Sequence, residues 1–423
     1  MSGEESLASA QEWPVIVIGA GAAGILAATR AAERGMRVLL VEKMPRTGTK
    51  ILMSGGTRCN ITHDTDRRGI IDAFGARSQG RFLHSALAAL SPQELIQIIE
   101  AEGVPTYVEE GRGKIFPKSD RASDVLAALM RRFQRSGAEL SLREPVISIS
   151  RAEDGFLLVT GKGMRRARQL IITTGGKSYP GSGTTGDAYR WLEVQGHSII
   201  DPKPALTPIT SDDVWVTDLR GIALERAMVR IKEGPKVLAE RLESVLFTHF
   251  GLSGPAILDV SRVVARHASP ASLCLEVDVF PNQKFDELDM AIRMTCGDEG
   301  KKQIGASLFR ELPRRLVEAI LRQAGVSMEV RGAELGRVER GQVAGAGKGL
   351  RVRVRGVRGF QVAEVTSGGV SLDEVDSRTM ESKLVPNLFL AGEVLDLDGP
   401  IGGYNFQAAF STGWLAANSI TNR

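Results

Sequence analysis

The stretch Val15-Ile16-Val17-Ile18-Gly19-Ala20-Gly21-Ala22-Ala23-Gly24 decides the fold. Its first four residues are β-branched and predict a short buried strand of a parallel sheet. Helix formers fill residues 25–34, and Gly35 stands where a helix would end. A second apolar run, residues 36–41, ends at Glu42. The order strand, glycine turn, helix, strand and acid predicts a dinucleotide-binding unit.

Each part of this unit has a physical role. The glycines permit a tight turn and a close approach of the backbone to a pyrophosphate, which the free N–H groups of the helix N-terminus attract. Glu42 follows Gly24 by 18 residues, a spacing suited to accepting hydrogen bonds from a ribose. A second pattern of this form, residues 181–186, does not directly follow a strand, so we expect a glycine loop there.

Composition sets the broad class. The chain has 423 residues, of which 43% are hydrophobic and 25% charged, and this excludes a disordered chain and a disulfide scaffold. Its length predicts two to three domains. Three cysteines without paired spacing argue against a zinc ribbon and fit a reduced, cytoplasmic compartment. We expect no membrane segment, because no apolar run is long enough, and no metal site, because the five histidines lack ligand spacing.

Charge is unevenly distributed. Residues 301–360 hold 14 Lys and Arg against 5 Asp and Glu, whereas the whole chain has a net charge of only +4. Arg351, Arg353 and Arg355 alternate with valines and so share one face of a predicted strand. A solvated surface explains this segment as well as a polyanion contact does.

Two later strands also end in glycine. They are residues 169–176 and 387–393, and the second ends in Gly392-Glu393. Together with the first glycine turn they resemble the landmarks of the glutathione-reductase-type FAD fold. Residues 47–60, which include Ser54-Gly55-Gly56-Thr57-Arg58-Cys59-Asn60, resemble the signature of the bacterial aminoacetone-oxidase-like flavoproteins, the BaiN–RdsA family. Thr57 departs from that signature, which has a third glycine.

The resemblance covers nearly the whole chain and implies an α/β fold. A discontinuous FAD-binding Rossmann domain would comprise residues 1–195 and 357–423. An inserted substrate or lid domain, residues 196–356, would be β-barrel-like with a helical part at about 255–330. Two local predictions come from the residues themselves. Ser91 caps a helix that runs to Glu102, and residues 341–349 form a mobile loop.

The glycine motif and the resemblance together predict the residues that contact FAD. These are Gly19, Ala20, Gly21, Ala22, Ala23, Gly24, Glu42, Lys43, Lys50, Ser54, Gly55, Gly56, Arg58, Cys59, Asn60, Val146, Thr174, Gly175, Gly392, Glu393, Gly403, Tyr404 and Asn405. NADPH or NADH would bind only transiently, as the electron donor.

A flavin supplies the redox chemistry, with hydride passing through its N5 atom, and the protein supplies orientation and protons. The candidate proton donors are Cys59, His249, Tyr404 and Lys50. Arg58 next to Cys59 would lower the pKa of the thiol. A structural role remains an alternative for each of them. No Gly-x-Ser-x-Gly motif is present, which argues against a hydrolase.

The resemblance implies three activities. They are reduction of uridine to dihydrouridine in large-subunit (23S) ribosomal RNA, oxidation of aminoacetone with release of hydrogen peroxide, and reduction of an enone. The basic segment favours the first, with Arg351, Arg353 and Arg355 as RNA contacts. A non-catalytic, FAD-bearing RNA-binding or assembly factor is the alternative of a different class.

Overall fold

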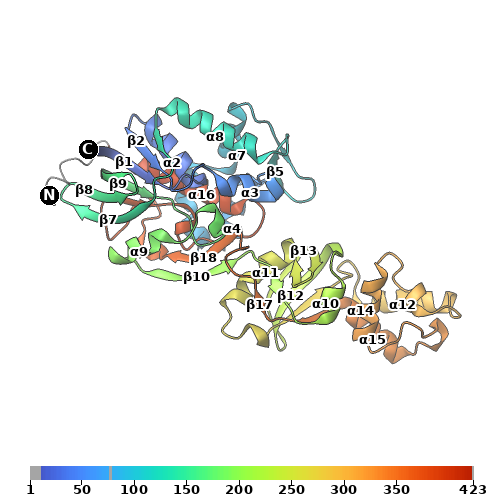
Figure 1. Cartoon of the computed structure of the whole chain (residues 1–423). Helices are drawn as coiled ribbons and strands as arrows, with labels where there is room; N and C mark the ends of the chain where they lie inside the picture. Colours follow the sequence, from blue (N-terminus) through green and yellow to red (C-terminus); the bar gives the residue numbers. More distant parts are fainter. Residues whose placement is uncertain (1–10, 76–78, 422–423) are drawn as a thin grey trace. The chain divides into compact units, whose positions relative to one another are not determined.

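The computed structural model describes residues 11–75 and 79–421 (Figure 1). The chain forms two compact units. The first joins Met1–Lys203 to Val365–Arg423, and the second is Pro204–Glu364. The second unit therefore begins and ends eight residues later than the expected insert, 196–356.

The first unit is built on a seven-stranded sheet in the order β6-β2-β1-β9-β8-β7, with β19 also paired to β9. Strands β6, β2, β1, β9 and β19 are parallel, and β7, β8 and β9 form an antiparallel meander. Their bounds are β1 (Gln11–Ile18), β2 (Val38–Val41), β6 (Glu139–Ser141), β7 (Val146–Ala152), β8 (Gly155–Thr160), β9 (Gly163–Ile172) and β19 (Leu388–Leu390).

Helices pack against this sheet to close one hydrophobic core. Helix α2 (Ala22–Glu33) packs on both α8 (Ala122–Ser136) and α16 (Tyr404–Ser419). Gly413 makes the α2–α16 contact possible, because a Cβ there would overlap the Ala23 carbonyl oxygen. The remaining helices of four or more residues are α3 (Thr49–Thr57), α4 (Arg67–Ala73), α5 (Gln79–Phe82), α6 (His84–Ala89), α7 (Pro92–Ala101) and α9 (Asp187–Val194).

Two small sheets complete the first unit. One has the order β3-β5-β4, with β3 (Thr62–His63), β4 (Thr106–Val108) and β5 (Lys114–Pro117). Strands β4 and β5 form a hairpin around Gly111 and Gly113. The other pairs β10 (Ile199–Ala205) with β18 (Val365–Val370), the two segments at which the chain leaves and re-enters this unit.

The second unit contains an antiparallel seven-stranded sheet in the order β16-β15-β12-β13-β14-β11-β17. Its strands are β11 (Ile209–Thr210), β12 (Ala223–Glu233), β13 (Lys236–Thr248), β14 (Gly251–Ser253), β15 (Cys274–Asp278), β16 (Leu350–Arg353) and β17 (Gly356–Val357). The outermost strands β16 and β17 are separated by only Val354 and Arg355. Because the two edges of the sheet are joined by so short a link, they approach each other.

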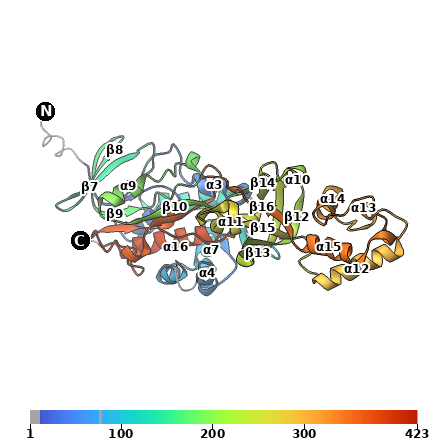
Figure 2. The same cartoon turned by 90° about the horizontal axis from the view of Figure 1, so that it is seen from below.

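The helical part of this unit lies later in the chain than expected. Helix α11 (Pro255–Arg266) packs on β12 and β13, so it belongs to the sheet layer, as does the short α10 (Val214–Asp218). A separate cluster contains α12 (Phe285–Asp298), α13 (Ile304–Ser307), α14 (Arg314–Gln323) and α15 (Arg337–Lys348), as Figure 2 shows. The prediction of a mobile loop at 341–349 is wrong, because α15 buries Val343, Ala344, Ala346 and Gly347. Among the described residues, no helix is long and apolar enough to cross a membrane.

Candidate active site

The carboxyl ends of the parallel strands meet at one edge of the sheet, where ligands bind in open α/β sheets. Hydrogen bonds join the segments that leave these ends. Gly19 N donates to Val41 O (2.8 Å), Thr173 N donates to Ile18 O (2.9 Å) and Ala391 N donates to Ile172 O (3.1 Å). The glycine turn, Glu42, the 173–178 segment and Gly392-Glu393 therefore share this edge.

Different constraints apply at the three glycine positions of the first turn. Gly19 has φ +99° and a Cβ there would lie 2.7 Å from Thr173 O. A Cβ at Gly24 would overlap Gly19 O, so this residue permits the helix to approach the strand. Gly21 has an ordinary φ of −86°, and a Cβ there would meet nothing within 4 Å. The fold does not require glycine at 21, whereas a ligand lying over the turn would.

The first turn of α2 is open to an anion. No side chain among the described residues caps it. Gly392, with φ +77°, lies against this turn, since a Cβ on it would be 3.0 Å from the Ala23 Cβ. The helix N-terminus has free N–H groups, and Gly392 places no side chain in front of it. This arrangement fits the pyrophosphate of a dinucleotide.

Glu42 connects the turn to the next strand. Its carboxylate accepts hydrogen bonds from Ala20 N (2.7 Å) and Met44 N (2.8 Å). A carboxylate has room for about four such bonds, so a ribose hydroxyl can still be bound. Glu144 N donates to the backbone carbonyl oxygen of Glu42 (2.9 Å), which ties the segment before β7 to the residue that follows β2. Lys43 instead binds Asp187 (2.5 Å) and Thr185 (2.6 Å), so its ammonium is already engaged.

The signature loop leaves helical geometry after Met53. Ser54 has ψ 152°, and Gly55, Gly56, Thr57 and Cys59 all have positive φ. The Asn60 amide ties this loop to the end of the chain, with its nitrogen 3.0 Å from Thr62 O and its oxygen 3.0 Å from Gly403 N.

The prediction that Arg58 lowers the pKa of Cys59 is wrong. Cys59 is 1% exposed, and burial raises the pKa of its thiol to about 12. The Arg58 guanidinium contacts Glu109 (3.2 Å) and lies 4.0 Å above the centre of the Phe116 ring. Glu109 on the β4–β5 hairpin neutralises the Arg58 charge, and burial favours the protonated form of the Cys59 thiol.

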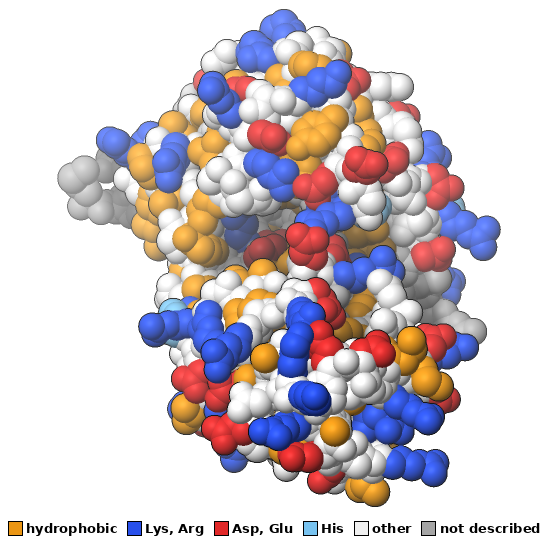
Figure 3. Space-filling model, turned by 90° about the vertical axis from the view of Figure 1, so that its right-hand side faces the viewer, with side chains coloured by type: hydrophobic (Ala, Val, Ile, Leu, Met, Phe, Trp, Pro, Cys, Tyr) orange, Lys and Arg blue, Asp and Glu red, His pale blue; other side chains and the backbone are white. Residues whose placement is uncertain are grey.

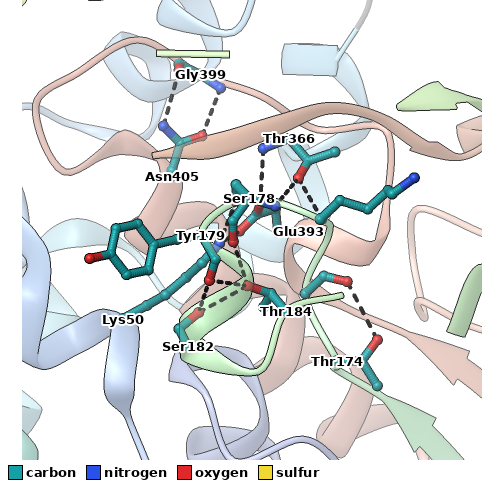
Figure 4. A network of polar contacts seen from close by, with 12 residues as sticks. Lys50, Thr174, Ser178, Tyr179, Ser182, Thr184, Thr366, Glu393, Gly399 and Asn405 are labelled. Carbon is teal, nitrogen blue, oxygen red and sulfur yellow. Dashed lines mark hydrogen bonds and ion pairs between the residues drawn. The ribbon is translucent and has the colours of Figure 1, made fainter. Parts of the chain in front are cut away.

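A polar cluster joins four segments at the sheet edge (Figure 4). Lys50 Nζ lies 2.6 Å from Glu393 Oε2 and donates to Ser178 Oγ (2.6 Å). Glu393 Oε1 also accepts from Ser178 Oγ (2.5 Å) and Thr366 N (2.9 Å). Lys50, a candidate proton donor, is therefore an ion-pair partner that holds Glu393 in place.

The segment after β9 is shaped to meet this cluster. Thr174 Oγ1 donates to Gly175 O (3.4 Å), and Gly175 has φ +73°. Lys177 N (2.7 Å) and Ser178 N (3.0 Å) donate to Thr366 Oγ1. The segment is thus fixed from both sides, by the strand and by Thr366.

The chain near Tyr404 contributes a second set of expected residues. Gly403, with φ +89°, precedes α16, and Tyr404 is the first residue of that helix. Asn405 closes the loop before it by accepting from Gly399 N (2.8 Å) and donating to Gly399 O (3.0 Å). The Tyr404 ring stacks on His63, with centroids 4.7 Å apart.

His249 lies in the second unit, after β13, with its ring edge-on to Phe250 at 4.9 Å. Its role as a proton donor stays a prediction.

The three arginines of the basic segment are exposed, as their alternation predicts, but each faces a carboxylate. Arg351 lies 3.3 Å from Glu276, Arg353 lies 2.6 Å from Asp213 and Arg355 lies 2.9 Å from Asp212. Figure 3 shows blue basic side chains interspersed with red acidic ones rather than forming one continuous patch. These ion pairs reduce the positive potential that the sequence count indicates.

One arrangement resembles a hydrolase triad. His197 lies 3.1 Å from Glu374 and 2.9 Å from Ser382 Oγ. That hydroxyl accepts from Leu384 N (3.1 Å) and Val385 N (2.9 Å), and Ser382 is only 6% exposed. These residues hold a turn together and offer no accessible nucleophile. No cluster of three potential metal ligands occurs among the described residues.

Sequence reasoning missed three residues that complete the site. Ser178 and Thr366 orient Glu393, and Glu109 binds Arg58. Ser178 lies just beyond the glycine-ended segment 169–176, so the sequence held a signal for its place near the site. Thr366 and Glu109 become neighbours of the site only through tertiary pairing.

The chain is similar to known proteins over nearly its whole length. The model of the HI0933-like protein Rossmann domain family matches residues 13–419. A ribosomal RNA dihydrouridine synthase of Escherichia coli (strain K12) is 32% identical over 97% of this chain and 98% of its own length. A 3-dehydro-bile acid delta(4,6)-reductase of Clostridium scindens is 27% identical over 96% of this chain and 98% of its own.

A solved structure shares the fold. The 3-ketosteroid delta1-dehydrogenase from Sterolibacterium denitrificans superposes with a TM-score of 0.50, at 15% identity, over 96% of this chain and 99% of that chain. The two chains share an α/β architecture, and their low identity carries no statement about substrate.

Proposed function

Because the chain belongs to the HI0933-like family of FAD-dependent oxidoreductases, we propose that it reduces uridine to dihydrouridine in large-subunit ribosomal RNA, with NADPH or NADH as electron donor. The observation that carries this proposal is near full-length similarity to two relatives. Ribosomal RNA dihydrouridine synthases of Escherichia coli and Haemophilus influenzae are 32% and 33% identical to the chain and are each covered over 98% of their length. A ribosomal RNA substrate would place the enzyme in the cytoplasm.

We assign the cofactor-holding roles from the geometry of the sheet edge. The first turn of α2, with Gly21 at its entrance, would bind the FAD pyrophosphate, and Glu42 would bind the ribose of the adenosine. Glu393, held by Lys50, Ser178 and Thr366, would bind hydroxyls of the ribityl chain. Bound FAD supplies two-electron chemistry that the side chains lack.

The candidate proton donors differ in their burial and in their hydrogen bonds. Cys59 is disfavoured because its raised pKa and burial make it a poor acid. Lys50 already donates to Glu393 and Ser178. Tyr404, the first residue of α16, and His249, which follows β13, both stay candidates.

We further propose that Arg351, Arg353 and Arg355 contact the RNA backbone by exchanging their carboxylate partners for phosphates. Changing all three to Ala should flatten the dependence of RNA affinity on salt by up to about 3 in the log–log slope. Arg378, exposed and paired to Asp376 at 3.2 Å in the first unit, is the matched control. An unchanged slope in the triple variant would contradict the RNA-face assignment.

A second candidate is an enone reductase. It is supported by the 27% identical bile acid reductase, whose name also describes reduction of a conjugated ring system. Aminoacetone oxidation and a non-catalytic RNA-binding role are the further alternatives.

The direct test uses ribosomal RNA from cells that lack the protein. FAD-loaded enzyme and NADPH are added, and dihydrouridine is mapped by mass spectrometry. The proposal predicts dihydrouridine at a defined position that is absent without enzyme. Reduction of a steroid enone, with the RNA left unmodified, would favour the second candidate instead.

A further inference from the structure

His63 and Tyr404 form a stacked pair between two motifs that lie far apart in the sequence. Their ring centroids are 4.7 Å apart and the ring planes make an angle of 22°. His63 follows the signature loop on β3, and Tyr404 opens α16. Both side chains are half-buried, so each ring retains exposed surface.

The orientation of His63 is fixed by a hydrogen bond. Its Nδ1 lies 3.1 Å from Gly402 O. A carbonyl oxygen only accepts, so Nδ1 carries the proton in this contact. The same bond holds the backbone immediately before Tyr404.

Glycines surround the pair where side chains would displace it. A Cβ at Gly113 would lie 2.7 Å from His63 Nε2. A Cβ at Gly402 would lie 3.0 Å from Tyr404 Cε2, and one at Gly403 would lie 2.5 Å from the Thr62 backbone. Gly113 and Gly402 therefore leave room for the two rings, and Gly403 lets the start of α16 approach the backbone of β3.

We propose that His63 is a positioning residue that holds the Tyr404 ring as a wall against which the planar uracil ring of the substrate stacks. This assignment rests on the proposed function, since it names the ring that the site receives.

The chemistry of the substrate supports a stacking wall. A base in folded RNA must leave its own stack to be modified, and aromatic side chains replace the neighbours it loses. Uracil is planar and conjugated, whereas the ring of dihydrouracil is saturated at C5 and C6 and puckered. A stacking wall would therefore bind substrate more tightly than product.

The test measures equilibrium binding of a fluorescein-labelled RNA stem-loop with a single loop uridine to the FAD-loaded protein. The same stem-loop with dihydrouridine serves as the second probe, because it keeps every phosphate and loses the planar ring. Steady-state kcat and KM for the uridine RNA are measured in parallel, and FAD absorbance and thermal unfolding verify that each variant is folded.

The variants distinguish the contribution of the aromatic rings from that of the hydrogen bond between His63 and Gly402 O. His63→Asn keeps an amide donor near Gly402 O and removes the ring. Tyr404→Leu removes the other ring, while Tyr404→Phe keeps it. Loss of stacking should raise Kd for the uridine RNA by about 5- to 150-fold in the first two variants. In His63→Asn, which keeps the Tyr404 hydroxyl, KM should rise and kcat should change little. Tyr404→Phe should bind within about twofold of the unmodified protein.

The β4–β5 hairpin offers a matched pair. Gly113→Ala and Gly111→Ala both place a Cβ at a positive φ, of +63° and +70°, but only Gly113 faces His63. Gly113→Ala should weaken binding more than Gly111→Ala, and this difference should disappear in the His63→Asn background.

The outcomes are distinct. If the unmodified protein prefers uridine RNA over dihydrouridine RNA and His63→Asn removes the preference, the assignment stands. If both His63→Asn and Tyr404→Leu keep the preference and the affinity, the wall is overturned and the proposed function survives. If the unmodified protein neither binds nor reduces the uridine RNA, the proposed function fails and this assignment fails with it.

Discussion

The substitution Gly21→Ala separates the demands of the fold from those of the cofactor. A Cβ at this position meets no protein atom within 4 Å, and φ is −86°, so alanine fits the apoprotein without strain. We expect the added methyl group to occupy space that the FAD pyrophosphate needs.

The effect on the apoprotein should be small because two contributions oppose each other. Replacing glycine restricts the unfolded chain and stabilises by about 0.4–1 kcal/mol. Alanine is a poorer N-cap residue than glycine, at a cost of similar size, and Gly21 is the N-cap of α2. The net change should lie within about 1 kcal/mol, a shift in Tm of a few degrees.

The effect on FAD should be large. Moving the pyrophosphate away from the helix N-terminus removes at least one charge-assisted hydrogen bond, about 1.5–3 kcal/mol. This corresponds to about a 10- to 150-fold rise in Kd. The assay is a fluorescence titration of FAD into apoprotein, with thermal unfolding of the same sample.

Gly24→Ala is the control. Its Cβ would overlap Gly19 O, so strand and helix must separate and the apoprotein itself should be destabilised. Wild-type FAD affinity in Gly21→Ala would refute the placement of the pyrophosphate. Equal destabilisation of the two apoprotein variants would refute the claim that the fold requires glycine at 24 but not at 21.

Three further predictions concern local strain, the buried thiol and a buried histidine. Thr57 is β-branched at φ +70°, so Thr57→Gly should stabilise by about 0.5–1 kcal/mol in urea unfolding while Thr57→Ala should not. Cys59, with a thiol pKa raised to about 12 by burial, should resist a thiol reagent at pH 8 until the protein unfolds, and fast labelling of the native state would contradict this. Burial lowers the pKa of His197 below 6.5 although Glu374 is 3.1 Å away. The unfolded chain then binds a proton that the folded chain does not, so stability should fall as the pH drops below about 6.5. His197→Asn should flatten the Tm profile in that window, and an unchanged profile would argue against this cause.

Local sequence was sufficient to predict the elements whose pattern lies within one contiguous segment. The strand–glycine–helix–strand order predicted β1, α2, β2 and the place of Glu42. The Ser91 capping box predicted the start of α7, and the structure contains both of its hydrogen bonds. These elements depend on contacts within a few residues.

Tertiary context decided the rest. The glycine-rich residues 341–349 read as a loop, yet α15 is stabilised by packing its small side chains against α12 and α14. Adjacency of Arg58 to Cys59 suggested a reactive thiol, but side chains of neighbouring residues diverge, and Arg58 contacts Glu109. The charge count over 301–360 could not include Asp212, Asp213 and Glu276, which pairing of strands brings to the arginines.

The ion pair between Lys50 and Glu393 is a contact within the site that local sequence could not predict. Both residues were expected at the cofactor, and they are 343 positions apart in the chain. No periodicity relates them. The parallel pairing of β2 with β1, of β1 with β9 and of β9 with β19 brings their segments to the same edge of the sheet.

The most direct test of the central claim is an anaerobic spectrum of the FAD-loaded protein. The flavin is first reduced with NADPH and then mixed with a uridine-containing ribosomal RNA fragment. We expect the oxidised flavin band to return as dihydrouridine forms in equal amount. A reduced spectrum that the RNA leaves unchanged, together with reduction of the oxidised protein by aminoacetone and peroxide release in air, would contradict it.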